Sequence, residues 1–133
     1  MTLTPSHAAA TYQTVEVTSR SPLELVVMLY DGALRFCDQA ATAMDAGDMP
    51  TKAVAMSRAF AILAELQNTL NLQEGGDVAQ SLDRLYNYVT GRLLDANVKK
   101  DPAPIEEAIR LLRPLRDAWA QIATPVPAAP AGR

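Results

Sequence analysis

The sequence has very few of the residues that most often carry out chemistry, with one cysteine and one histidine among 133 residues. His7 stands alone near the N-terminus, so neither the Glu-x-x-His pairs of di-metal bundles nor a mid-helix phosphorelay histidine is present. Cys37 has no cysteine partner and falls on an apolar helical stripe, where we expect a small buried side chain. No nucleophile and base pair is recognisable. The sequence therefore predicts a protein that is not an enzyme and uses no metal or cofactor.

Positive charge and long apolar runs are also scarce. The 12 Lys and Arg are outnumbered by 15 Asp and Glu, and the net charge of −3 argues against binding to nucleic acid, which needs a basic surface. No apolar run reaches the roughly 18 to 20 residues of a membrane span, and no secretory leader is present. The absence of a Gly-x-x-x-x-Gly-Lys loop argues against ATP-driven work. We therefore expect a cytoplasmic protein without membrane insertion.

The composition that remains is typical of packed helices. Apolar residues make up 49% of the chain and aromatic residues only 5%. Alanine and leucine are prominent, which favours helix-on-helix packing over β-rich architectures. A chain of 133 residues has room for one domain with one core. We therefore expect a single all-α domain.

The segment 21–47 carries more apolar surface than one helix normally buries. Ser21, Pro22 and Glu24 predict a capping box with proline at the first helical position, and Gly47 supplies the stop. Two neighbouring apolar stripes cover more than half of the helix circumference, at about 100° per residue. The stripes are Leu23, Val27, Tyr30, Leu34, Cys37, Ala41 and Met44, and Val26, Leu29, Ala33, Phe36, Ala40 and Ala43. Either this helix is the most buried member of a bundle, or part of its apolar face is kept for a partner.

Three further amphipathic helices are predicted. The second covers residues 50–70, and Asp77 caps a third helix whose apolar stripe runs over 79–96. A fourth helix starts at residues 101–102 and contains Pro114. An internal proline removes one backbone hydrogen bond at a cost of about 3 kcal/mol, so we expect a kink there.

Four helices joined by short links pack most simply as an antiparallel four-helix bundle, which we place at residues 21–123. Residues 1–20 have little apolar periodicity, although Tyr12 and two valines stand out. Two interpretations of this segment stay open. It is either a disordered tail or a mobile, extended strap that covers the apolar surface of the first helix when no partner is bound. The Pro/Ala-rich residues 124–133 are predicted to be a disordered tail, because they cannot form a core.

A series of motifs occurs in order and at close spacing between residues 12 and 119. The motifs are SPLELVVMLYDGALRF at 21–36, AFAILAELQNTLNLQEGGDVAQSLDRLYNYV at 59–89, RLLDANVKKD at 92–101 and LLRPLRDAW at 111–119. No single motif is specific, but their combination resembles the FliS family of flagellin export chaperones. Pro114 and the Pro/Ala-rich tail depart from the family pattern, which affects only contacts made by the fourth helix.

The resemblance implies an antiparallel four-helix bundle that binds the C-terminal segment of flagellin in the cytoplasm. Such a chaperone blocks premature polymerisation and presents the subunit to a component of the flagellar type III export gate. The resemblance also implies further partners, such as an anti-sigma factor or another flagellar assembly factor. No cofactor or chemical step is required. An amphipathic client that folds on binding would suit a bundle with surplus apolar surface.

We expect client contacts along the first, second and third helices and in the N-terminal segment. The predicted partner-binding residues are Tyr12, Leu25, Leu29, Tyr30, Ala33, Phe36, Ile62, Leu66, Leu70, Tyr86, Leu93, Ala96 and Asn97. Core packing is the alternative for most of them. Asp31 and Asn97 match the family pattern and are alternatively caps or crosslinks, and Gly32 is expected to let a neighbouring backbone approach closely. The competing function is a structural or regulatory bundle whose exposed apolar face meets its own copy as a homodimer.

Overall fold

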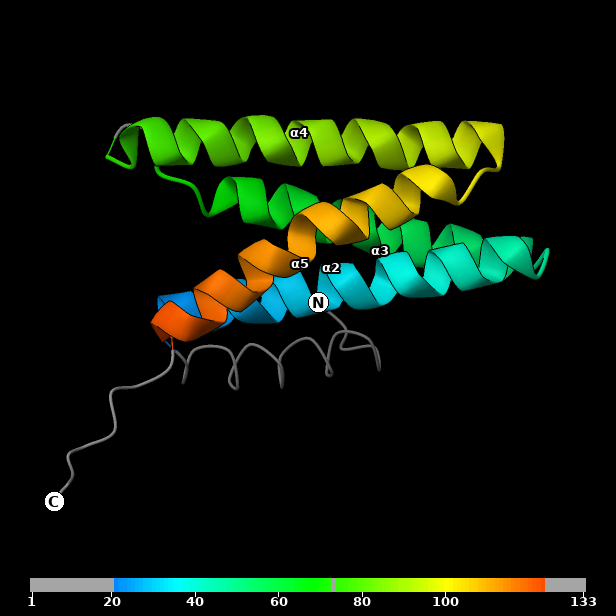
Figure 1. Ribbon diagram of the computed structural model, residues 1–133, viewed down its shortest axis with the longest axis horizontal. Helices are drawn as coiled ribbons and strands as arrows, with labels where there is room; N and C mark the ends of the chain where they lie inside the picture. Colours follow the sequence, from blue (N-terminus) through cyan, green and yellow to red (C-terminus); the bar gives the residue numbers. More distant parts are fainter. Residues whose placement is uncertain (1–20, 73, 124–133) are drawn as a thin grey trace, which may run out of the picture.

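The structure is a computed structural model that describes residues 21–72 and 74–123. In that part of the chain it contains helices and no strand. The helices are α2 (Pro22–Asp45), α3 (Met49–Asn68), α4 (Gly76–Lys99) and α5 (Ala103–Ala123). Each helix runs opposite to the one before it, which confirms the predicted all-α, antiparallel four-helix bundle (Figure 1). The predicted strap at 1–20, which includes Tyr12, and the predicted tail at 124–133 lie outside the described residues.

The two ends of α2 lie where the sequence predicts them. Ser21 Oγ accepts a hydrogen bond from the Glu24 N–H at 3.2 Å, and Glu24 Oε1 accepts one from the Ser21 N–H at 2.9 Å. This capping box satisfies backbone donors that have no partner inside the helix. At the other end Gly47 adopts a φ of 73°, a left-handed conformation that glycine reaches without steric cost. Both the capping box and the glycine stop are confirmed.

The start of α4 differs from the prediction. Gly75 occupies the N-cap without a side-chain hydrogen bond and the helix begins at Gly76, so Asp77 is not the cap. The reason is a turn in which the Asn71 carbonyl accepts a hydrogen bond from the Gly75 N–H at 2.7 Å. Gly76 then adopts a left-handed φ of 58° as the first residue of α4, so the helix has already begun when the chain reaches Asp77. The carboxylate of Asp77 lies in the first turn instead, where the helix dipole still favours a negative charge.

The replacement Gly75→Ala is expected to lower the free energy of unfolding by about 1 to 3 kcal/mol, because the turn has no room for a methyl group. A Cβ at this position would lie 2.6 Å from the Asn71 carbonyl oxygen and 2.6 Å from Ala79 Cβ. The matched control is Gly91→Ala, where a Cβ meets nothing within 4 Å. Alanine in that helix interior should stabilise by about 0.5 to 1 kcal/mol. Urea titrations of the two variants measure both values, and equal stabilities would contradict the tight turn.

Pro114 does not end α5, which continues through it from Ala103 to Ala123. The proline and Arg110, whose carbonyl loses its helical N–H partner, are both exposed to solvent. Water can therefore reach this carbonyl, which reduces the cost of the missing backbone hydrogen bond. The kink expected at Pro114 stays a prediction.

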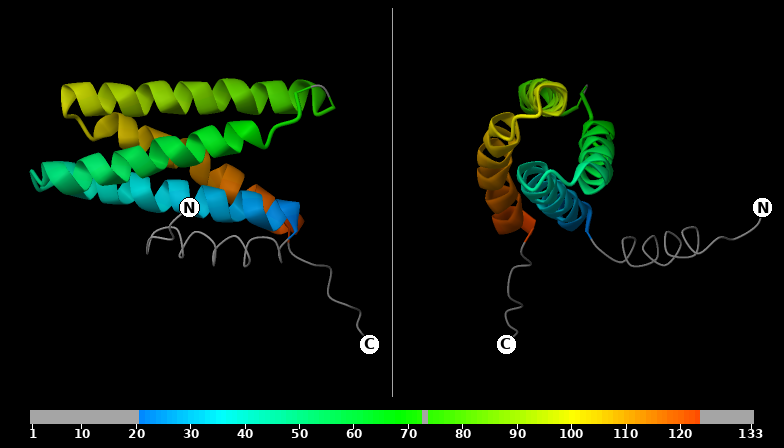
Figure 2. Two further views of the ribbon diagram at one scale, coloured as in Figure 1. Left: turned by 180° about the vertical axis from the view of Figure 1, so that it is seen from behind. Right: turned by 90° about the vertical axis from the view of Figure 1, so that its right-hand side faces the viewer.

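α2 is the helix around which the bundle is packed. It has extensive contacts with α3 and α5, whereas α4 makes fewer contacts with its two neighbours. Figure 2 shows α4 and α2 at opposite corners of the bundle, with α3 and α5 between them. The side chains of Tyr30, Ala33 and Cys37 on α2 are completely buried, and burial raises the pKa of the Cys37 thiol to about 12. Cys37 is therefore a packing residue, as expected, and α2 agrees with the first of its two interpretations.

Gly32 shows one local difference from the sequence-based expectation. A Cβ at Gly32 would lie 2.9 Å from Ile62 Cδ1 on α3, and no backbone atom of another helix comes within 4 Å. The close neighbour of Gly32 is thus a side chain, and the prediction of a close backbone approach is wrong. Without a Cβ, Gly32 leaves space for the Ile62 side chain against α2.

Candidate functional site

A groove of about 400 Å³ lies between α4 and α5. Its lining is mainly apolar and consists of Asp77, Val78, Ser81, Leu82 and Leu85 from α4 and Leu115 from α5. The three apolar residues from α4 are spaced four and three positions apart, so they share one side of that helix. The groove therefore presents a continuous apolar surface that could accept one face of another helix.

The groove forms because α4 and α5 separate along their length. The two helices lie close together near the link at 100–102 (Figure 1). They move apart toward the N-terminus of α4 and the C-terminus of α5, and both views in Figure 2 agree on this. Val78 and Leu85 belong to the separated half of α4, where α5 covers less of their surface.

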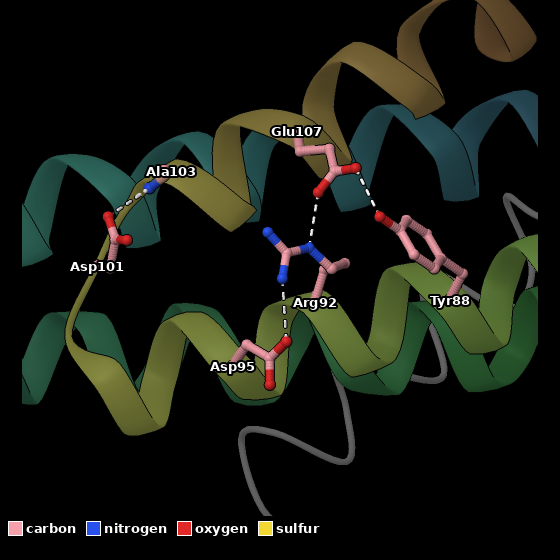
Figure 3. Close-up of polar contacts among 6 residues, drawn as sticks. All are labelled: Tyr88, Arg92, Asp95, Asp101, Ala103 and Glu107. Carbon is pink, nitrogen blue, oxygen red and sulfur yellow. Dashed lines mark hydrogen bonds and ion pairs between the residues drawn. The ribbon is translucent and has the colours of Figure 1, made fainter.

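A polar cluster holds the other half of the pair together (Figure 3). The carboxylate of Glu107 on α5 accepts hydrogen bonds from Arg92 Nε at 2.6 Å and from the Tyr88 hydroxyl at 2.7 Å, both on α4. Arg92 also pairs with Asp95 at 3.0 Å. The two hydrogen bonds lower the pKa of Glu107, so its carboxylate stays charged over a wider pH range. The cluster sets how α5 lies on α4 at one end and leaves the opposite end for the groove.

Exposed apolar side chains are concentrated on α4. Four of the nine large apolar residues exposed among the described residues are on this helix, namely Val78 at 67%, Tyr88 at 48%, Leu94 at 49% and Val98 at 79%. α2 contributes only Met28, at 37%. Exposed large apolar side chains are therefore more numerous on the third predicted helix than on the first, because α3 and α5 together cover α2.

Neither a metal-ligand cluster nor a membrane-spanning helix is found in the part of the chain that the structure describes. Within residues 21–72 and 74–123, no three His, Cys, Asp or Glu side chains come together as ligands for a metal ion. Every helix in those ranges is too short or too polar to cross a bilayer.

Comparison with known families identifies the family to which this chain belongs. The sequence model of the family described as flagellar protein FliS matches residues 5–126. The chain belongs to the FliS family. This membership confirms the resemblance seen in the sequence motifs, and the match includes all residues of the α4–α5 groove.

Individual relatives agree with this family assignment. The FliS-family chain is 39% identical over 107 residues to the flagellar secretion chaperone FliS of Salmonella typhimurium, covering 80% of this chain and 79% of the relative. It is 35% identical over 107 residues to that of Vibrio cholerae, with the same coverage. The Bacillus subtilis protein of that name is 36% identical over 110 residues, or 83% and 81% of the two chains. These relatives are named chaperones and not enzymes, in agreement with the prediction from the sequence.

The structure places the predicted partner-binding residues of this FliS-family chain in three groups. Six are in the core with at most 1% of their surface exposed: Tyr30, Ala33, Leu66, Tyr86, Leu93 and Ala96. Four are partly buried against that core: Leu29, Phe36, Ile62 and Leu70. Leu25 and Asn97 are also partly exposed. In this conformation the first group supports the bundle, and only the others reach its surface.

Two polar residues that match the FliS pattern act as crosslinks between helices. Asn97 on α4 accepts a hydrogen bond from Lys52 Nζ on α3. Asp31 on α2 pairs with Arg116 Nε on α5 at 2.7 Å. Each contact joins a different pair of neighbouring helices, as expected from the crosslink interpretation.

The hydroxyl groups of Tyr30 and Tyr86 form a hydrogen bond of 2.7 Å in the middle of the FliS-family bundle. The rings meet edge to face, with centroids 6.2 Å apart, and link α2 to α4 across the core. Burial is the main cause of the raised pKa of both phenols. This bond gives each of the two buried hydroxyl groups a hydrogen-bond partner.

The replacement Tyr86→Phe is expected to lower the free energy of unfolding by about 1 to 3 kcal/mol, because it leaves the Tyr30 hydroxyl buried without this partner. The double variant Tyr30→Phe, Tyr86→Phe should recover most of the loss, since two apolar rings replace the pair. Urea titrations of the single and double variants measure this coupling. Strictly additive losses would contradict a shared hydrogen bond.

The sequence reasoning missed four groove residues, namely Val78, Leu82, Leu85 and Leu115. The spacing of the first three was visible in the sequence and gave a helical stripe beside the one that ends at Ala96. The divergence of α4 from α5 could not be seen in the sequence, because it depends on how α4 packs on α3 and how α5 packs on α2.

Proposed function

We propose that this FliS-family protein is a cytoplasmic export chaperone for flagellin. It binds the C-terminal segment of flagellin, prevents premature polymerisation and delivers the subunit to the flagellar type III export apparatus. The observation that supports the proposal is the apolar groove between α4 and α5 in a chain whose relatives are named flagellar secretion chaperones.

The groove suits a client that is unfolded until it binds. A disordered amphipathic segment can place the apolar face of a nascent helix on Val78, Leu82 and Leu85. Burial of apolar surface contributes roughly 25 cal/mol per Å², but the client loses conformational freedom as it orders. This cost keeps binding reversible even when the contact area is large, as export requires.

The client site extends onto the partly exposed members of the predicted set. Leu25, Leu29 and Ile62 reach the surface along α2 and α3, so a long client segment would continue around the bundle from the groove. The residues 1–20, with Tyr12, are proposed as a strap that competes with the client. The partners of the loaded chaperone are a component of the export gate and an anti-sigma factor or another assembly factor.

A homodimer of the free protein is the second proposal for the apolar surface. Leu94 and Val98 lie exposed on the outer side of α4, and a Cβ on neighbouring Gly91 would meet nothing within 4 Å. A second copy could therefore approach this side of α4 closely.

The test adds a synthetic peptide of the flagellin C-terminal segment to the full chain and measures mass by light scattering. A one-to-one complex that replaces any dimer is the expected result. The control is a peptide of the same composition in scrambled order, which lacks the amphipathic pattern. An unchanged dimer in excess peptide would contradict the chaperone proposal and support the homo-oligomer.

A further inference from the structure

Phe36 lies against two guanidinium groups that come from different helices. Arg35 Cζ, on α2, is 4.9 Å from the centre of the Phe36 ring, and Arg58 Cζ, on α3, is 5.6 Å from it. Both arginines are exposed, and the ring is partly buried. The face of an aromatic ring attracts a cation, so Phe36 holds two positive charges together at the α2–α3 seam.

These two arginines differ from the arginines that crosslink the bundle. Arg92 and Arg116 are paired with carboxylates across helix boundaries. Arg35 and Arg58 take part in none of the ion pairs formed among residues 21–72 and 74–123. Two cations at one ring repel each other, although the whole chain has a net charge of −3. A carboxylate from outside would relieve this repulsion, and guanidinium groups bind carboxylates with strong, directed hydrogen bonds.

Apolar surface continues from the arginines along the same seam. Ile62 lies one turn after Arg58 on α3 and packs over Gly32, which is one turn before Phe36 on α2. One turn further along α2 is Met28, with 37% of its surface exposed. Arg35 Nη2 lies 4.0 Å from the position that a Cβ at Gly32 would take, so the seam presents an apolar strip with two cations beside it.

We propose that this seam is a docking site for an acidic amphipathic helix of a second protein. The carboxylates of that helix pair with Arg35 and Arg58, and its apolar residues, one turn away, lie on Ile62 and Met28. Charge complementarity selects the occupant, since an apolar helix without acidic residues leaves both cations unpaired. The site lies on the opposite side of the bundle from the α4–α5 groove (Figure 2), so the acidic helix and the part of a client in the groove can be bound together, whereas a client segment that continued over Ile62 would compete with the acidic helix.

The test uses two labelled synthetic helices with the same leucine stripe. One has glutamate one turn from each leucine, and its control has glutamine at those positions. Fluorescence anisotropy with the full chain should show that the glutamate peptide binds at least about tenfold more tightly, with an affinity that falls as salt is added. Equal binding of the two peptides, or better binding of a single-stranded DNA oligonucleotide, would overturn the proposal.

Variants of the full chain locate the binding site of the glutamate peptide. The double variant Arg35→Gln, Arg58→Gln should bind the glutamate peptide about tenfold more weakly than the native chain does. The control Arg113→Gln changes another exposed arginine, on α5, and should not affect this peptide. Circular dichroism of each variant checks that the helices are retained. An unchanged affinity of the folded double variant would overturn the proposal.

Client binding is measured on the same variants so that the two proposals can fail separately. The double arginine variant should still bind the flagellin peptide, and a substitution in the α4–α5 groove should still permit binding of the glutamate peptide. If the folded double variant no longer bound either the flagellin peptide or the glutamate peptide, the seam would be part of the client site. A separate docking site would then be ruled out.

Discussion

The replacement Val78→Asp is expected to weaken binding of the flagellin C-terminal peptide by roughly ten- to a hundredfold. Complete burial of a valine side chain contributes about 1.5 to 3 kcal/mol, and the replacement removes that contribution. The new carboxylate would also lie beneath the bound client, and removing its water on binding costs free energy. Because 67% of the Val78 surface is exposed in the free protein, the fold should tolerate the change. Isothermal titration of variant and native chain measures the loss.

The matched control is Val98→Asp on the same helix. Val98 is 79% exposed and is not among the residues that line the groove. It receives the same new charge, so a general electrostatic effect on the client would appear in both variants. Equal losses in the two variants would contradict a client site in the α4–α5 groove, and a loss confined to Val98→Asp would move the site to the outer side of α4.

The replacement Leu93→Ala is expected to lower the free energy of unfolding by about 2 to 5 kcal/mol. Leu93 has 0% of its surface exposed and belongs to the central cluster of the core. Removing its side chain loses apolar burial and leaves a cavity that the surrounding helices can close only in part. Urea titration followed by circular dichroism gives the loss as a shift of the midpoint at unchanged slope.

The next residue along the chain provides the control for this prediction. Leu94 is 49% exposed on the outer side of α4, and Leu94→Ala should change the stability by no more than about 0.5 kcal/mol. Leu93 was one of the predicted client contacts, so client binding is measured on both variants under conditions where both are folded. A small effect of Leu93→Ala on stability would show that this side chain is not part of the core.

The local features of the helices could be read from the sequence because they depend on neighbours within a few positions. Ser21 and Glu24 form a capping box through groups three residues apart, and Gly47 ends α2 through its own backbone conformation. Asp77 shows the limit of this reasoning. Whether it caps the third helix depended on the turn at Asn71, after which Gly76 takes a left-handed φ of 58° where the helix begins.

The candidate site was harder to predict than the helices for a related reason. A stripe at helical spacing indicates which side chains share a face, but it does not show which neighbouring helix covers them. Tyr30 and Leu66 therefore looked like client contacts, and the structure places both in the core. Val78 and Leu85 belong to an equally regular pattern, but they line the groove because α5 moves away from them.

The sequence by itself determined the four helices found among residues 21–72 and 74–123 and most of their ends, together with membership of the FliS family from the order of its motifs. These properties follow from local hydrogen bonding, helical periodicity and residue types. Only the tertiary structure decided where apolar surface remains open. Burial depends on the angles at which four helices cross, and the Arg92–Glu107 cluster at one end of the α4–α5 pair leaves the other end to form the groove.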